Sequence, residues 1–86
     1  MWFVYILECK DKSLYTGVTN NIERRYREHL NKKSHYTSYN PPVRLACKET
    51  YSTRAEALKR EAQIKRWTRR KKIALINGDF ALLKQL

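Results

Sequence analysis

The apolar segment at the start of the chain constrains the fold more than any other feature of the sequence. Between Trp2 and Cys9, apolar side chains occupy both alternating sets of positions. A strand with only one packed face would alternate between apolar and polar residues, whereas this pattern is typical of a strand covered on both faces. We therefore expect residues 2–9 to form a central strand between two layers of helices.

The residues after this strand predict a β-hairpin. Residues 10–13 are turn-like and residues 14–18 are rich in β-formers, so the hairpin spans 2–18. Opposite residues of an antiparallel pair have a constant index sum, and an even sum places Tyr5 and Tyr15 on the same face. An even sum requires a loop of odd length, such as three or five residues, whereas a two-residue turn would separate the two phenols.

Capping residues predict where the later helices begin. Asn20 with Glu23, and Thr53 with Glu56, have the spacing of capping boxes, and Thr68 is placed to cap a further helix. The expected elements after the hairpin are a helix over 21–31, a strand over 43–51, helices over 54–67 and 69–76, and a short helix after position 79. In the strand, we expect four residues to share one face: Val43, Leu45, Cys47 and Tyr51.

This element order, ββαβααα, predicts an α+β fold with a three-stranded antiparallel sheet flanked by helices. The 86 residues are enough for one small domain, so we expect a single domain over 1–86. There is no apolar run of the length needed to cross a membrane, and the N-terminus has no basic segment followed by a cleavage site. The sequence therefore predicts a cytoplasmic protein with no membrane contact.

The charge of the chain indicates a polyanionic partner. Nineteen Lys and Arg residues face eight Asp and Glu residues, which gives a net charge of +11. Nine of the cations lie in residues 54–72 with only Glu56 and Glu61, so pairs within the helix leave most of them without an acid. Nucleic acid is the expected partner, because its phosphates release counterions when such cations bind.

Three polar residues on the predicted helices are candidates for chemistry. Glu61 falls between Leu58 and Ile64 on the helical wheel, so its carboxylate points inward and needs a cation, a hydrogen-bond donor or a metal ion. Arg25 and His29 are four positions apart beside the apolar stripe and can meet one ligand. Alternatively, Arg25 pairs with a nearby acid and His29 is a core histidine.

Together these positions resemble the GIY-YIG nuclease family, and the similarity covers nearly the whole chain. Residues 3–5, Phe-Val-Tyr, stand at the first tripeptide and residues 15–17, Tyr-Thr-Gly, at the second. Arg25 follows Gly17 by eight positions in the next helix, as the family's arginine does, and Glu61 matches its metal-binding glutamate. The sequence is most similar to the small single-domain bacterial members, which are related to the nuclease domain of the excision-repair incision subunit.

The resemblance implies metal-dependent hydrolysis of phosphodiester bonds in DNA. Repair, or the processing of branched or single-stranded DNA, is the role expected from it. Glu61 would hold one Mg²⁺ or Mn²⁺ ion, Tyr5 or Tyr15 would take a proton from water, and Arg25 would clamp the phosphate. His29 would orient the water or Tyr5. For this chemistry the metal ion, Arg25 and the surrounding positive charge must together favour the phenolate, and the five side chains must converge on one cleft.

The rival hypothesis is a non-catalytic module that binds DNA or RNA and retains the nuclease fold. Two tyrosines in the polar loop, Tyr36 and Tyr39, can stack on the bases of a single strand. Neither hypothesis requires a small-molecule cofactor. The cations expected to bind nucleic acid are Arg24, Lys65, Arg66, Arg69, Arg70, Lys71 and Lys72.

Overall fold

The structure is a computed structural model that describes residues 1–31 and 40–86. Its elements, in chain order, are β1 (Trp2–Cys9), β2 (Leu14–Thr19), α1 (Ile22–Leu30), β3 (Pro42–Tyr51), α2 (Arg54–Lys65), α3 (Arg69–Ile76) and α4 (Phe80–Gln85). The predicted order ββαβααα is confirmed. In the part of the chain described, none of these helices is both long and apolar enough to span a membrane.

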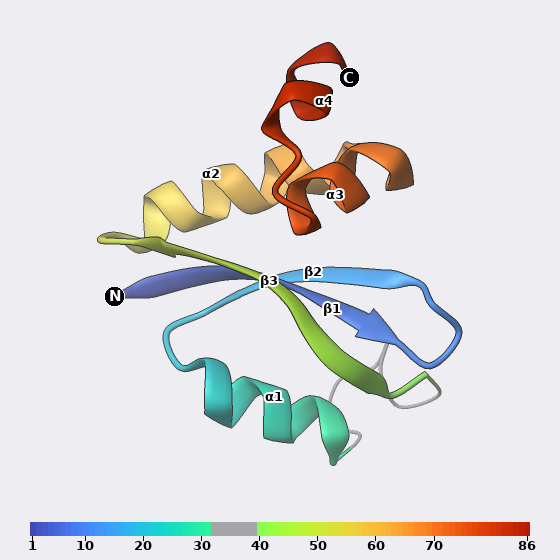
Figure 1. Ribbon diagram of the computed structural model, residues 1–86. Helices are drawn as coiled ribbons and strands as arrows, with labels where there is room; N and C mark the ends of the chain where they lie inside the picture. The colour runs from blue at the N-terminus through green and yellow to red at the C-terminus, as the bar shows by residue number, and fades with distance from the viewer. Residues whose placement is uncertain (32–39) are drawn as a thin grey trace.

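The three strands form one sheet in the order β2-β1-β3, with both neighbouring pairs antiparallel. Figure 1 shows α1 on one face of this sheet and α2, α3 and α4 on the other. The predicted α+β fold is therefore confirmed, with β1 as its central strand.

The alternation of β1 divides the buried side chains between the two layers. Val4 and Ile6 are each 1% exposed and pack in a core cluster with Ala57, Ile64 and Leu75 of α2 and α3. The intervening Tyr5 and Leu7 are buried on the face that α1 covers. Because both faces of β1 are covered, the strand needs apolar residues at every position, which explains the pattern in the sequence.

The turn between β1 and β2 sets the register of the hairpin. The amide of Cys9 donates to the Ser13 carbonyl at 2.9 Å, and the amide of Lys12 donates to the Cys9 carbonyl at 2.8 Å. The loop therefore has three residues, 10–12, and Lys12 adopts a positive φ of 71°. Tyr5 lies opposite Gly17 and Leu7 opposite Tyr15, so the prediction that an odd loop places both phenols on one face is confirmed.

Two irregularities in β3 make the prediction of a single shared face wrong. Ile6 pairs with Cys47 but the next residue, Leu7, pairs with Leu45, and a second shift follows Glu8. Each extra residue of a bulge reverses the side-chain alternation. Cys47 accordingly packs on the core cluster beneath α2, whereas Leu45 contacts the opposite layer beside Ile22 and Tyr26 of α1.

The caps of α2 and α3 are as predicted, but the start of α1 is one residue later. The Thr53 and Thr68 hydroxyls accept from the amides three residues on. At α1 the cap is Asn21, whose side chain accepts from the Arg24 amide at 3.0 Å, so the predicted Asn20 capping box is wrong. The reason is that the Thr19 hydroxyl, at the end of β2, accepts from the Asn21 amide at 3.1 Å and fixes that residue before the first turn.

Candidate active site

Four of the five predicted catalytic side chains come together between the sheet and α1. Tyr5 and Tyr15 share the face of the sheet that α1 covers, and the spacing of four places Arg25 and His29 on the side of α1 that faces them. The ring centroids of Tyr5 and Tyr15 are 6.3 Å apart. The His29 ring lies 6.0 Å from that of Tyr5 and 5.0 Å from that of Tyr15.

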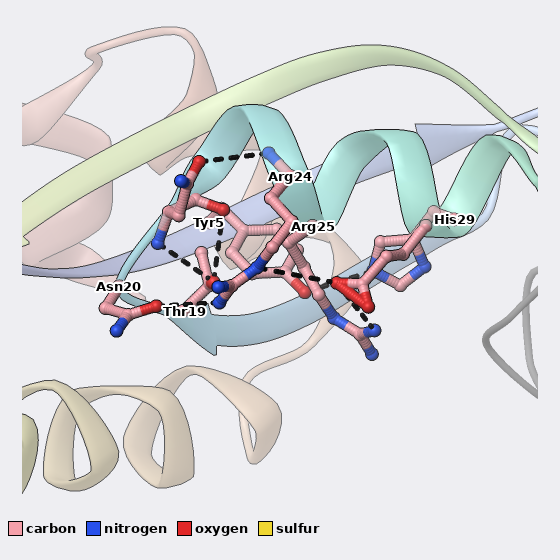
Figure 2. Close-up of polar contacts among 8 residues, drawn as sticks. Tyr5, Thr19, Asn20, Arg24, Arg25 and His29 are labelled. Atoms are coloured by element: carbon pink, nitrogen blue, oxygen red, sulfur yellow. Dashed lines mark hydrogen bonds and ion pairs between the residues drawn. The ribbon is translucent and has the colours of Figure 1, made fainter.

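A hydrogen bond joins Tyr5 to His29 inside this cluster (Figure 2). The Tyr5 hydroxyl lies 3.0 Å from Nε2 of His29, whose side chain is completely buried. Burial, together with the charge of Arg25, lowers the pKa of His29 to about 4, so the imidazole is neutral at pH 7. Arg25 also hydrogen-bonds the Tyr5 oxygen, to which its guanidinium can only donate. The tautomer of the neutral imidazole decides whether Tyr5 or Nε2 of His29 donates in the bond between them.

The surroundings of Tyr5 favour its protonated form. Burial raises the pKa of Tyr5 to about 12; the charges of Tyr15 and Glu61 act in the same direction, and the hydrogen bond from Arg25 opposes them. Tyr5 is only 2% exposed, so desolvation of its phenolate outweighs the nearby guanidinium. Arg25 therefore favours the Tyr5 phenolate, as expected, but in the protein alone it does not offset burial, and the combined effect with a metal ion stays a prediction.

Arg25 lies between the two phenols and the solvent. Its guanidinium is 3.9 Å from the Glu28 carboxylate, and its side chain is 29% exposed. Burial lowers the pKa of Arg25, but the hydrogen bonds and charges of Tyr5 and Tyr15 outweigh burial, and the net pKa is raised. The predicted pairing of Arg25 with a nearby acid is therefore present in Glu28, and a ligand shared by Arg25 and His29 stays a prediction.

Gly17, the last residue of the second tripeptide, has a steric part in this site that its place in the motif does not reveal. The Tyr5 ring lies directly against it, so a Cβ at position 17 would be 2.6 Å from Cζ of Tyr5 and closer still to the hydroxyl oxygen. A glycine inside a strand is the available signal, because it often marks the close approach of another group to the backbone. Gly17 thus makes room for the phenol that bonds His29.

Glu61 belongs to the other layer of helices. It lies on α2, across the sheet from α1, and its side chain is 19% exposed with its carboxylate 3.5 Å from Nζ of Lys65. Its charge contributes to the raised pKa of Tyr5, which relates it electrostatically to the phenol. Within residues 1–31 and 40–86, no group of three or more His, Cys, Asp and Glu residues lies together. Convergence of Glu61 with the other four side chains stays a prediction.

The cations predicted to bind nucleic acid are distributed over several surfaces. On α1, the guanidinium of Arg24 donates to Asn20 at 2.9 Å and is 58% exposed as a side chain. Arg69, in the first turn of α3, donates to the Lys12 carbonyl at 2.7 Å and so ties that helix to the hairpin turn. Lys65 pairs with Glu61, whereas four others are at the junction of α2 and α3: Arg66, Arg70, Lys71 and Lys72.

The loop tyrosines predicted to stack on bases, Tyr36 and Tyr39, lie outside the described residues. The predicted cations and catalytic residues, in contrast, are all within residues 1–31 and 40–86. The arrangement of Tyr5, Tyr15, Arg25 and His29 combines a guanidinium that can bind an anion with phenols and an imidazole that can hold or move a proton. This chemistry suits a phosphate ester.

Comparison with known proteins gives a consistent result for both sequence and fold. A family model described as the GIY-YIG catalytic domain matches residues 1–74. A UPF0213 protein of Staphylococcus epidermidis is 48% identical over 75 residues, which cover 86% of this chain and 92% of that protein. A UPF0213 protein of Haloquadratum walsbyi is 51% identical over 71 residues, which cover 81% of this chain and 80% of that protein.

A solved structure has the same fold. The solution NMR structure of a UPF0213 protein from Bacillus halodurans superimposes with a TM-score of 0.58 at 40% sequence identity, covering 90% of this chain and 84% of the other. The family match extends over both tyrosines, Arg25, His29 and Glu61. The chain therefore belongs to the GIY-YIG family, a nuclease-type family, and is similar to its small UPF0213 members.

Proposed function

We propose that this protein is an endonuclease that hydrolyses phosphodiester bonds in DNA with the help of one divalent cation. The observation that carries the proposal is the cluster in which the partly exposed Arg25 contacts both phenols while the buried, neutral His29 bonds Tyr5. A module that only binds phosphate has no need for a buried phenol and imidazole beneath its arginine. Membership of a nuclease-type family supports the same function.

Arg25 is the residue suited to hold the scissile phosphate. It keeps its positive charge at any pH of interest, and its partly exposed guanidinium can bind two oxygens of one phosphate. Because Tyr5 and Tyr15 hold the guanidinium in place, it can stabilise the negative charge that develops on the non-bridging phosphate oxygens in the transition state without further reorganisation.

Of the two phenols, Tyr15 is the one placed to take a proton from water. Tyr5 is 2% exposed and its pKa is raised to about 12, so it neither reaches water nor ionises readily. Tyr15 is half-buried at the edge of the cluster, where water can reach it, and it also hydrogen-bonds the Arg25 guanidinium. Tyr5 and His29 are then positioning residues. Their hydrogen bond holds the Tyr5 phenol, and this phenol in turn hydrogen-bonds Arg25.

Glu61 fits the part of a metal ligand. It is a largely buried carboxylate that belongs to no group of three or more potential metal ligands in the described chain. Mg²⁺ commonly binds in this way, through one or two carboxylates, with water molecules and substrate phosphate filling its remaining positions. When bound, such an ion supplies charge neutralisation and an acidic water. Lys65, at 3.5 Å, would have to give up its contact with Glu61.

The experiment that tests this function is a cleavage assay with labelled single-stranded, duplex, flap and RNA substrates in Mg²⁺ or Mn²⁺. We expect cleavage of DNA that EDTA abolishes. Glu61→Gln and Arg25→Ala should each lower the rate by about 10²–10³-fold while binding is largely kept. The matched controls are Glu23→Gln and Arg27→Ala, which change the same charges at exposed positions of α1.

Two results would contradict the proposal. Cleavage by Glu61→Gln at the wild-type rate would remove the metal assignment. Binding to DNA or RNA without turnover of any substrate would favour the rival hypothesis of a non-catalytic module. The pairing of Glu61 with Lys65 is the specific observation that favours this rival, because it gives the carboxylate a structural partner.

A further inference from the structure

A second cationic surface lies around Trp67, where α2 ends and α3 begins. A groove of about 510 Å³ is lined there by Lys59, Ala62, Gln63, Arg66 and Trp67. We call it the Trp67 groove. Three of its five lining residues carry a cation or an aromatic ring, and none of the predicted catalytic side chains belongs to it.

One side of the groove is rigid. Arg60 donates from Nε and Nη2 to the two oxygens of Glu49 on β3, at 2.9 and 3.2 Å, and from Nη1 to Gln63 at 2.8 Å. Its guanidinium carbon is 4.9 Å from the centre of the Trp67 ring. Bidentate pairing fixes this guanidinium, and the cation–π contact in turn holds the indole. The indole is therefore a preformed element of the surface.

The remaining cations of the groove have no such partner. Nζ of Lys71 lies 4.6 Å from the centre of the same ring. Within the described chain, Lys59, Arg66 and Lys71 form no ion pair with an acid. Cations gathered without acids repel one another, and phosphates relieve this repulsion with release of counterions. Lys71 can leave the ring for a phosphate, and its departure uncovers the indole for a base.

The position of the groove favours a single strand over a duplex. The groove lies in the layer of α2 and α3, across the sheet from α1 and Arg25 (Figure 1). The molecule is only 18 Å deep along its shortest axis. A duplex is stiff over about 150 base pairs, so it cannot bend around the molecule from Arg25 to the groove. It also keeps its bases stacked inside and presents none to Trp67. A single strand can do both.

We propose that the Trp67 groove binds a single-stranded segment of nucleic acid, with phosphates on Lys59, Arg66 and Lys71 and one base stacked on Trp67. The inference rests on the proposed function and deepens it, because it identifies the single-stranded part of the substrate. Aromatic rings beside unpaired cations are the common means of binding single strands without sequence preference.

Fluorescence of Trp67 tests the inference directly. The chain has two tryptophans, so Trp2→Phe leaves Trp67 as the only one. In EDTA, which prevents cleavage, a short oligothymidylate should quench this fluorescence saturably. A duplex of equal length and inorganic polyphosphate should not, because neither offers a free base. Equal quenching by duplex, or no change at a saturating concentration of oligothymidylate, would overturn the inference.

A charge comparison adds a second readout. Replacing both Lys59 and Arg66 by Gln should weaken oligothymidylate binding about tenfold and lower the salt slope of the logarithm of the binding constant by about 1.4, that is about 0.7 for each lost contact. The control is Lys10→Gln with Lys84→Gln, which removes the same charge from exposed positions outside the groove. An equal loss in the control pair would show general attraction alone and would overturn the groove.

These outcomes separate the inference from the proposed nuclease activity. Cleavage in Mg²⁺ without quenching in EDTA would retain the nuclease and reject the groove. Quenching with the expected charge dependence, but no cleavage of any substrate, would support the groove and reject the nuclease.

Discussion

Replacement of Gly17 by alanine is the sharpest test of the site's geometry. The new Cβ would lie 2.6 Å from Cζ of Tyr5 and closer still to its oxygen, whereas carbon atoms pack at about 3.5 Å or more. The phenol must therefore move by about 1 Å. It cannot do so without compressing or breaking the 3.0 Å hydrogen bond to the fully buried His29.

The cost can be worked from these contacts. Overpacking of a buried ring costs about 1–3 kcal/mol, and loss of one hydrogen bond adds about 1 kcal/mol. We expect Gly17→Ala to reduce the free energy of unfolding by about 2–4 kcal/mol. For a domain of this size, each kcal/mol lowers Tm by about 4–8 °C, so thermal unfolding followed by circular dichroism should show a decrease of about 8–32 °C.

A double-mutant cycle identifies the cause of this decrease. A Tyr5→Phe background lacks both the hydrogen bond to His29 and the hydroxyl oxygen, which is the atom nearest the added Cβ, so the cost of Gly17→Ala should fall by at least about 1 kcal/mol. Gly78→Ala is the matched control: Gly78 has a φ of +69° and no atom within 4 Å of its added Cβ, so its cost is backbone strain and is the same in both backgrounds. A Gly17→Ala protein that melts within about 2 °C of the wild type would refute the close contact of Tyr5 and Gly17.

Three other predictions follow from the contacts described. The pKa of His29 is lowered to about 4, so between about pH 6.5 and pH 4 the unfolded chain binds more protons than the folded protein. The free energy of unfolding should therefore be highest above this window and fall by about 3 kcal/mol as the pH decreases through it. Urea unfolding at several pH values should show this loss, with a flatter profile for His29→Gln. Glu49→Gln weakens the bidentate pair with Arg60 and should cost about 1–2 kcal/mol by urea unfolding, against no loss for exposed Glu23→Gln. Lys71→Gln with Lys72→Gln should lower the salt slope of single-stranded DNA binding by about 0.7 for each lost phosphate contact, and an unchanged slope would exclude both residues from the nucleic-acid interface.

The sequence predicts those features that depend on periodicity alone. The two apolar faces of β1 identify it as the central strand, because alternation in a strand directly reports which faces are covered. Parity does the same for Tyr5 and Tyr15: any odd loop places them on one face, and the loop has three residues. The caps of α2 and α3 are equally local, since Thr53 and Thr68 bond amides only three positions away.

Features that depend on partners distant in sequence are beyond such reasoning. The bulges of β3 arise from its pairing with β1, and nothing between Val43 and Cys47 marks them. The pKa of Tyr5 was expected from charge, but burial beneath α1 determines it, and burial is a property of the packed layers. The sequence does not indicate the role of Trp67 in a binding surface. Its ring contacts Arg60 of α2 and Lys71 of α3, and these contacts depend on how the two helices are placed on either side of it.

The edge strand β2 determines where a complete active site must lie. Glu61 and Arg25 belong to helices on opposite faces of the sheet, so they can serve one phosphate only around an edge, and not through the sheet. The edge concerned is β2, which carries Tyr15 and Gly17. The Tyr5 hydroxyl lies against Gly17, and the charge of Glu61 acts on the Tyr5 phenol. β3, at the other edge, is instead joined to α2 through Glu49 and Arg60. The proposed catalytic site and the Trp67 groove would therefore lie on opposite flanks of α2, and a strand held by both would cross that helix.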